Sequence, residues 1–281
     1  MTLRLADISA RIEGIKQLGA VVNAMRGIAA ARVRQAQTQL GAVDGYASVI
    51  AEGIGRTLAM MPSHPEATEM QGRPALIVFV AEQGFAGAFS ERVLDFVEPE
   101  LAKSVLFLVG TRGGTVLAER GLTPDWSGAL PSHSAGIPKL ADQIGEALYP
   151  RIVKGEIERL DVVFARSEPG HPPEVRRGQL LPLDADKFSS PAQLDQPLLN
   201  LELPVLLAGL TADFLQAQIC HAALHAFAAE NEARMQAMAA ARDQIERQLA
   251  KLSAKERQVR QEEITAEVIE LAAGASASIS A

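Results

Sequence analysis

The chain has 281 residues, of which 48% are hydrophobic and 22% are charged, so it is long enough to bury a sizeable core. Its formal net charge of -7 argues against nucleic acid as a partner, because phosphate binding requires a basic surface. The single cysteine, Cys220, excludes an internal disulfide and favours a reducing compartment, while an aromatic content of 4% argues against a large aromatic-lined substrate pocket.

A long first helix is predicted from near Leu3 to Leu58, within a first segment 1–58, because no proline interrupts it and apolar residues recur at helical spacing. Alternating steps of three and four residues are typical of a coiled-coil seam. Glycines are frequent in this helix, and each costs about 1 kcal/mol relative to alanine, so packing must hold the helix. The seam residues are Leu5, Ile8, Ile12, Ile15, Leu18, Val22, Met25 and Ala29.

A proline-containing stretch follows, and we interpret residues 59–73 as a linker in which His64 is a solvated loop residue. Between residues 74 and 205, short apolar runs alternate with helical patterns, which predicts a Rossmann-like α/β domain with a mainly parallel sheet covered by helices. Residues 175–184 are expected to add an antiparallel strand. The other expected elements are strands at Ala75–Val80, Ser104–Val109 and Leu160–Ala165, and helices at Glu91–Leu101 and Leu140–Lys154.

The last segment, residues 206–281, is predicted to form one helix from about Thr211, whose hydroxyl can cap it, to about Ala273. Apolar residues recur in it at heptad spacing and predict a weaker seam, which pairs with the first helix in a long antiparallel two-helix coiled coil. Because this helix is the longer one, its end from about Ile264 is expected to lack a partner within the chain. The seam residues here are Met238, Ile245, Leu252 and Val259.

No uninterrupted apolar run of about 18 residues is found, so no membrane-spanning helix is expected. The coiled-coil pattern begins by Leu5, which leaves no room for a signal peptide.

The sequence contains no catalytic constellation. The stretch Gly110–Gly114 follows a strand but lacks both dinucleotide-binding and P-loop spacing, and the glycines of Gln83–Ala88 are explained by a sharp strand-to-helix turn. His221 and His225 have the spacing of a metal pair on a helix, but no third ligand accompanies them, so a packed helical face is favoured. We therefore expect neither a metal nor a cofactor.

Arginines on the two long helices are open to two interpretations. Arg32 and Arg34 stand among alanines without an acidic neighbour, so they are either simply solvated or form a basic collar for a partner's carboxylates. Arg234, beside Glu230, and Arg260, near Glu262, can make pairs within their helix or contacts with another subunit.

Three stretches, Val21–Arg34, Glu230–Met238 and Arg260–Glu267, resemble three motifs of one family in the correct order. These are the IT-KAM-x-M-VAA-x-KMR, SE-xx-ARM-xAM and RQ-xx-IT-xE motifs of the gamma subunit of F-type ATP synthases. Gly274–Ala275 is similar to the family's small-residue ending, and Gln83–Phe89 to its RGLCGG-x-N motif without the Cys and Asn.

This chain also has Gly27 in place of the family's usual Met, and Arg32 in place of Lys. These departures indicate a divergent member and leave two subtypes open, a housekeeping enzyme and an alternative sodium- or proton-translocating enzyme.

The resemblance implies a non-catalytic central-stalk rotor subunit of an ATP synthase that couples ion flow through a membrane c-ring to ATP synthesis or hydrolysis at beta subunits. It implies as partners the alpha and beta hexamer, the epsilon subunit and the c-ring, with membrane contact only through that ring. It places the subunit peripherally on the cytoplasmic side of a bacterial plasma membrane. The implied hexamer contacts are Arg32, Arg34, Arg234, Arg260, Gln261, Thr265 and Glu267.

Two other functions remain open on the sequence. One is a non-rotary coiled-coil adaptor that uses its α/β domain for docking. The other is a small-molecule transferase that uses the loop at Gly110. The coupling ion and the physiological direction are not encoded in this chain, because the ion ligands belong to the membrane ring.

Overall fold

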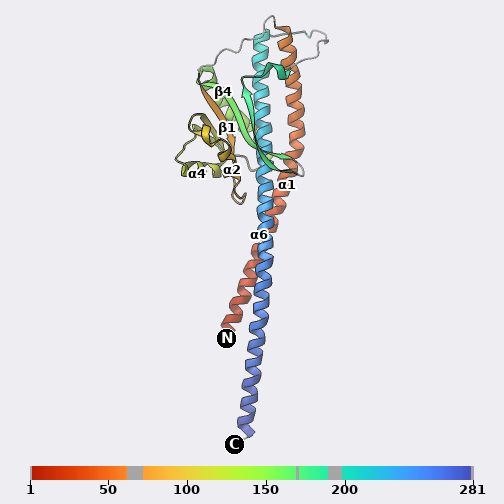
Figure 1. The fold of residues 1–281 in the computed structure, drawn as a ribbon. Coiled ribbons are helices and arrows are strands. Elements are labelled where there is room, and N and C mark those ends of the chain that lie inside the picture. Colours follow the sequence, from red (N-terminus) through yellow and green to blue (C-terminus); the bar gives the residue numbers. More distant parts are fainter. Residues whose placement is uncertain (1, 62–71, 169–170, 189–197, 280–281) are drawn as a thin grey trace. The chain divides into compact units, whose positions relative to one another are not determined.

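The computed structural model describes residues 2–61, 72–168, 171–188 and 198–279, and Figure 1 follows the chain through them. The chain forms two compact units. One consists of residues Ala29–Arg234, and the other of Met1–Ile28 together with Met235–Ala281. Helix α1 (Thr2–Met60) and helix α6 (Leu203–Ile279) each contribute to both units.

The first unit contains a five-stranded sheet in the order β3-β2-β1-β4-β5. Strand β1 pairs in parallel with β2 and with β4, β2 pairs in parallel with β3, and only β5 is antiparallel, to β4. The mainly parallel sheet and the antiparallel strand expected from the sequence are thus confirmed. The strands are β1 (Arg73–Phe79), β2 (Val105–Val109), β3 (Trp126–Gly128), β4 (Ile157–Glu168) and β5 (His171–Leu181).

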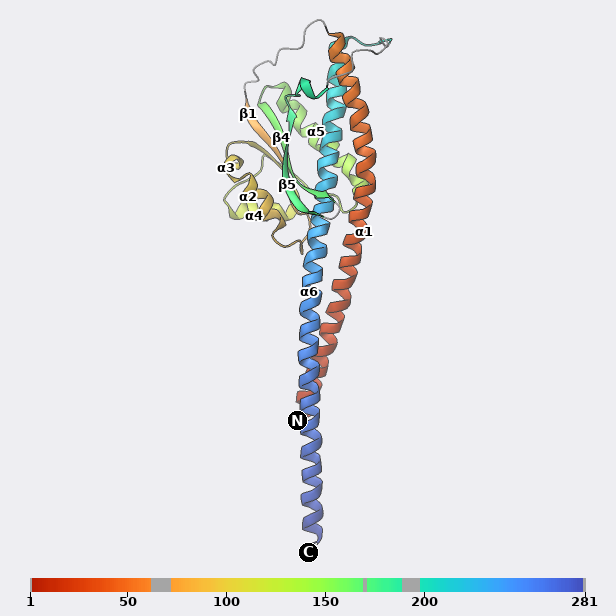
Figure 2. The same cartoon turned by 45° about the vertical axis from the view of Figure 1, so that its right-hand side comes forward.

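Both faces of this sheet are covered, which explains why its central strands are continuous apolar runs rather than alternating ones. Ile77 and Phe79 point to one face, where they join a core with α5, whereas Leu76 and Val78 join a second core on the other face. Figure 2 shows α5 on one side of the strands and α2, α3 and α4 on the other. These helices are α2 (Phe89–Phe96), α3 (Glu98–Leu101), α4 (Thr111–Glu119) and α5 (Ile137–Val153), with 3-10 turns at Ser134–Gly136 and Ala185–Phe188.

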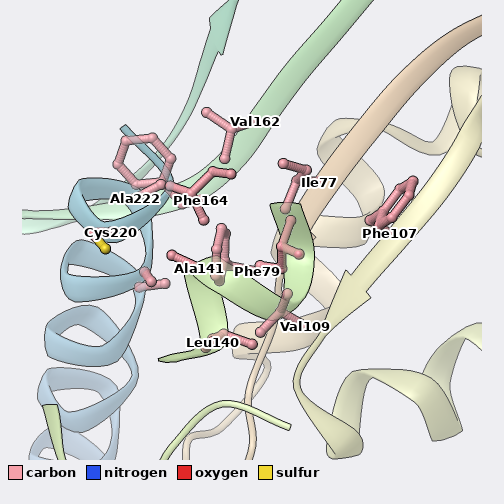
Figure 3. Packing of buried hydrophobic residues seen from close by; sticks show 14 of the residues in the cluster. Ile77, Phe79, Phe107, Val109, Leu140, Ala141, Val162, Phe164, Cys220 and Ala222 are labelled. Carbon is pink, nitrogen blue, oxygen red and sulfur yellow. The ribbon is translucent and has the colours of Figure 1, made fainter. Parts of the chain in front are cut away.

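Helix α6 completes the core on the α5 side of the sheet. Figure 3 shows Cys220 and Ala222 of α6 near Phe164 of β4 and Ala141 of α5. Cys220 is buried and unpaired, and burial raises the pKa of its thiol to about 11, so this cysteine packs as a small apolar residue.

The sequence analysis missed two elements and misplaced the start of a third. Helix α4 at residues 111–119 and the short strand β3 were not predicted, and α6 begins at Leu203 instead of near Thr211. Pro204 suggested a linker, but proline is tolerated in the first turn of a helix, where its missing N–H has no intrahelical partner to lose.

The two adjacent glycines of α4 differ in their surroundings, and this difference yields a testable prediction. A Cβ on Gly113 would lie 2.1 Å from Val80 Cγ2 and 2.5 Å from Val80 Cβ, whereas a Cβ on Gly114 would meet only Leu108 Cδ2 at 3.9 Å. Gly113→Ala is expected to destabilise the fold by about 2 kcal/mol through overpacking. Gly114→Ala should stabilise it by about 0.5–1 kcal/mol. Urea denaturation of both variants measures this, and equal effects would contradict the packing explanation.

The second unit is an antiparallel pair formed by the start of α1 and the end of α6. Ile8 and Ile12 pack with Val259 in one buried cluster, and Val22 packs with Met238 and Ile245 in another. Residues earlier in α1 thus pack against residues later in α6, as in an antiparallel pair. The predicted seam residues Ile15, Met25 and Leu252 are partly buried against the same clusters. Gly19 allows close approach here, since a Cβ on it would lie 3.4 Å from Ile245 Cγ2.

Helix α6 continues past the last buried seam residue, Val259, to Ile279. Beyond it Ile264, Val268 and Leu271 are exposed, as expected for an end without a partner in the chain.

Near its other end, α6 also meets the length and composition criteria for a membrane-spanning helix, with a window mean hydropathy of 1.4. These criteria concern average hydropathy and tolerate up to two charged residues in the window, whereas the sequence expectation concerned an uninterrupted apolar run. The criteria concern length and composition alone, and 22% of the window is buried. Within α6, Leu215 and Ile219 are buried in the core of the first unit.

Candidate partner-contact site

Four of the residues predicted to contact a partner lie on the last part of α6. Arg260, Gln261, Thr265 and Glu267 are all exposed. Among the described residues, the ion pair of Arg260 is a long one with Glu256 within the helix, at 3.9 Å between Nη2 and Oε1. The Thr265 hydroxyl donates to the backbone carbonyl of Gln261 at 2.8 Å, and Gln261 is itself exposed. These side chains are therefore available to another protein.

The same stretch of α6 carries an exposed apolar stripe. Ile264, Val268 and Leu271 follow one another at helical spacing on one face and are 55%, 59% and 74% exposed. Large apolar side chains left in water on one helix face are typical of a surface that another protein covers.

The arginines predicted on α1 have different surroundings. Arg34 is exposed, whereas Arg32 is half-buried and donates from Nη1 to Gln83 Oε1 at 3.2 Å. Gln83 belongs to the loop that follows β1, which we call the β1 loop and define as residues 82–88. Arg32 therefore makes a contact within the chain as well as presenting a charge on α1.

Arg234 is buried rather than displayed at the surface. Only 4% of the residue is exposed, and its guanidinium pairs with Glu230, one helical turn earlier on α6. It also donates to the carbonyls of Gln83 and Gly84, both at 3.2 Å, and to Asn231 Oδ1 at 3.0 Å. Of the two sequence interpretations, the geometry supports an intrahelical pair, and it adds a contact with the β1 loop that the sequence did not indicate.

Glu230 binds the backbone of the same loop. Its carboxylate accepts the N–H groups of Glu82 at 3.1 Å and Gln83 at 3.0 Å, and only 3% of the residue is exposed. The carboxylate thus occupies a position between backbone donors where a ligand anion could otherwise bind.

This position is the point in the fold where open α/β sheets usually bind ligands. The chain leaves β1 toward β2 and β3 on one side and returns to β4 on the other, so the crevice at the carboxyl ends of β1 and β4 is a topological switch point. Helix α6 fills it, with Glu230 on the β1 loop and Glu232 accepting a hydrogen bond from Ser167 of β4. The domain therefore resembles a nucleotide-binding sheet whose ligand position is closed by its own last helix.

The start of α4, where the sequence left nucleotide binding open, is likewise occupied. Glu82 Oε2 accepts the backbone N–H of Thr111 at 3.0 Å and that of Leu130 at 2.9 Å, while the N–H of Arg112 donates to Ala81 O at 3.1 Å. The protein's own carboxylate caps the helix end that would have bound a phosphate.

His221 and His225 form a packed pair rather than a metal site. Their ring centroids are 4.5 Å apart, His225 stacks on Phe164, and His221 Nε2 lies 3.4 Å from Oδ1 of Asp44 on α1. Burial lowers the pKa of both imidazoles, that of His225 to about 4. Among the residues that the structure describes, no group of three or more His, Cys, Asp or Glu side chains could hold a metal ion. His64 lies outside those residues.

Sequence reasoning found the arginines but missed the acidic residues that position them. Glu230 and Arg234 have the spacing of a helical ion pair, which is visible in the sequence, yet such pairs are common on solvated helix faces. The contacts of Glu230 and Glu82 with backbone N–H groups depend on loops far away in the chain, so no local pattern could reveal them.

Comparison with known proteins gives consistent results along the whole chain. The model of a family described as ATP synthase matches residues 4–277. The chain is 28% identical to the ATP synthase gamma chain of Thermobifida fusca, over 95% of this chain and 94% of that protein. It is 27% identical to the ATP synthase gamma chain of Lachnoclostridium phytofermentans, over 97% and 98% of the two chains.

Solved structures share the fold at lower identity. A chain from the rotor of the Euglena gracilis mitochondrial ATP synthase superposes with a TM-score of 0.67 at 14% identity, over 94% of this chain and 100% of that one. A chain from the OSCP/F1/c-ring assembly of the same enzyme gives 0.70 at 14% identity, over 99% and 95%. At this identity the likeness establishes the shared fold.

Proposed function

Since the chain belongs to the ATP synthase family and is a gamma chain of that enzyme, we propose that it turns as a central-stalk rotor and couples ion flow to ATP chemistry on other subunits. The observation that carries the proposal is the exposed part of α6 that follows Val259. Its apolar stripe at Ile264, Val268 and Leu271 and the polar side chains beside it are exposed on a single helix.

The proposed mechanism depends on asymmetry and not on reactive groups. In the coiled-coil unit two helices lie together as far as Val259, whereas α6 alone continues to Ile279. Such an element touches each of several identical surrounding subunits differently, so rotating it changes their relative affinities for nucleotide through a coupling free energy. We assign ATP binding and hydrolysis to those subunits.

The proposed partners are an alpha and beta hexamer, an epsilon subunit and a membrane c-ring. We propose that the hexamer contacts Arg34 of α1 and the exposed α6 residues Arg260, Gln261, Thr265 and Glu267, with Arg32 adding charge beside Arg34. We assign Arg234 to contacts within the chain, because its guanidinium is already surrounded by acceptors from the β1 loop. The complex is membrane-bound, and we propose that this subunit lies peripherally on the cytoplasmic side of a bacterial plasma membrane.

The chain contains a matched pair of sites to test this proposal. Arg257–Gln258 and Arg260–Gln261 are the same two residue types, one turn apart on α6, and all four side chains are exposed. Co-expressed with its alpha, beta, epsilon and c subunits, the wild-type chain should give a stable, coupled ATPase. Replacing Arg260 and Gln261 by Ala should lower ATP synthesis about tenfold, as truncation of central interface residues does.

The control is the double Ala variant at Arg257 and Gln258, which should retain most of the synthesis rate. Neither pair is buried, so thermal unfolding of the isolated chain should shift little in both variants. Equal losses of synthesis in the two variants would contradict the proposed contact. Recovery of the wild-type chain only as a free monomer would contradict the rotor function and favour the adaptor.

A further inference from the structure

Three elements of the first unit meet at the β1 loop. Helix α6 holds the loop through Glu230 and Arg234, helix α1 reaches it through Arg32, and the sheet continues directly into it from β1. The loop is also tied to the start of α4 and to the segment after β3, because the Glu82 carboxylate accepts the backbone N–H groups of Thr111 and Leu130.

The hydrogen bonds on the α6 side are directional and enclosed. Glu230 accepts two backbone N–H groups while Arg234 donates to two backbone carbonyls, so the two residues together bind both kinds of main-chain group in consecutive loop residues. Both side chains are almost fully buried, at 4% and 5% exposed. Water therefore cannot easily replace these bonds when the helix and the loop are pulled apart.

On the α5 side of the sheet, α6 packs larger side chains into the core, among them Leu215, Ile219 and Phe227. On the opposite face, beside this loop, the core residues of α6 are the alanines Ala229 and Ala233, and apolar packing there would resist such a displacement weakly. Alanine has no side chain long enough to interdigitate, so this face can slide with little steric resistance. The hydrogen bonds of Glu230 and Arg234 require a fixed geometry, so they resist a sliding movement of α6 against the loop that the alanines would allow.

We propose that Glu230 and Arg234 form a latch that makes the sheet and α6 turn as one body, so that torque applied to the α/β domain reaches the coiled-coil part of α6. The inference rests on the proposed rotor function and assigns positioning roles within it. The latch lies at the carboxyl ends of β1 and β4, where open α/β sheets usually bind a nucleotide. In this chain the loop at that position binds helix α6 instead.

The test uses the complete complex in lipid vesicles and the ratio of ATP-driven membrane potential to ATP hydrolysed, which reports pumping of either ion. The variants are Glu230→Gln and Arg234→Lys, which keep size or charge but cannot reproduce the carboxylate or the guanidinium fork. Pumping per ATP is expected to fall about fivefold or more, within the range seen when a coupling network is broken. The rate of ATP hydrolysis should persist.

Two controls separate a latch from a merely structural role. Arg242→Lys and Glu246→Gln alter an exposed Arg–Glu pair on the same helix and should leave pumping per ATP unchanged. Asp161→Ala destabilises the same unit by breaking an ion-pair network between β4, β5 and α3 that does not include the β1 loop.

If Glu230→Gln lowers pumping per ATP no more than Asp161→Ala does at an equal loss of melting temperature, the latch is refuted while the rotor function stands. A wild-type complex that hydrolyses ATP without pumping would instead refute the proposed function on which the latch rests.

Discussion

Asp161→Ala is expected to lower the free energy of unfolding by about 3 kcal/mol or more, because it breaks a buried ion-pair network by removing its central acid. Asp161 lies on β4 and is only 1% exposed. Its carboxylate accepts hydrogen bonds from both Nε and Nη2 of Arg177 on β5, the former at 2.9 Å, and from Arg159 Nε at 3.1 Å.

A second acidic partner of Arg177 limits this loss of stability. Arg177 also pairs with Glu100 of α3 at 2.6 Å, and this hydrogen bond is the main cause that raises the pKa of Arg177 and lowers that of Glu100. When Asp161 is removed, Arg177 keeps this half-exposed partner, so the loss should lie near the lower end of the range for a broken buried pair.

Glu174→Ala is the matched control for this prediction. Glu174 is an acid on β5 that pairs with Arg176, but both side chains are more than half exposed. The change should alter stability by no more than about 0.5 kcal/mol. Urea denaturation of the isolated chain compares the two variants, and similar losses would show that burial of Asp161 does not determine its contribution.

The second large effect is a loss of stability in mild acid that depends on His225. Burial lowers the pKa of His225 to about 4 in the folded protein, with smaller contributions from His221 and Arg166, against about 6.5 when unfolded. Below pH 6.5, His225 is therefore protonated in the unfolded chain, whereas in the folded protein it stays neutral until the pH approaches 4. Stability should fall as the pH drops from about 6.5 toward 4, by about 2 kcal/mol at pH 5.

The groups around His225 explain why it stays neutral. His221, on the same helix, and Arg166, on β4, both disfavour a second positive charge, and Asp44 of α1 only partly offsets them. Within the described residues its Nδ1 is buried without a hydrogen-bond partner, so a proton there would have no acceptor. Asp44 lies nearer to His221, which burial also shifts to a lower pKa.

His225→Phe removes this titration and retains a ring on Phe164. The wild-type chain should lose about 2 kcal/mol more than the variant between pH 7 and pH 5, as measured by urea denaturation at each pH. His133→Asn serves as the control, because it removes an imidazole from an exposed position instead of a buried one. Parallel pH profiles for the wild type and His225→Phe would show that His225 does not resist protonation in the fold.

The sequence predicted the elements whose signal is local and repeated. The strands β1, β2 and β4 are apolar runs, and the coiled-coil seam recurs over many turns, so both follow from periodicity. Helix α4 was missed because Gly113 and Gly114 have low helix propensity. It forms because Gly113 lets the helix pack closely on Val80 and because Glu82, from another loop, caps its first N–H.

The surroundings of some candidate contact residues could be predicted from the sequence, and those of others could not. Exposed residues such as Arg260 and Gln261 lie on a helix that the sequence already indicated, so their accessibility followed from the predicted end of the seam. The burial of Arg234 did not, because an arginine near glutamates has the same local pattern on a solvated face as in a core. Only the path of the β1 loop, set by the whole sheet, distinguishes the two.

The pairing of α1 with α6 also constrains biosynthesis. Helix α1 leaves the ribosome before α6, but its glycines weaken it, and a lone helix in water is marginal. Its seam partners Met238, Ile245 and Val259 are translated long after it. At about 5–20 residues per second, a nascent chain waits roughly 10–50 s for them. During that time the apolar seam of α1 is open to chaperones, and premature termination would leave it permanently unpaired.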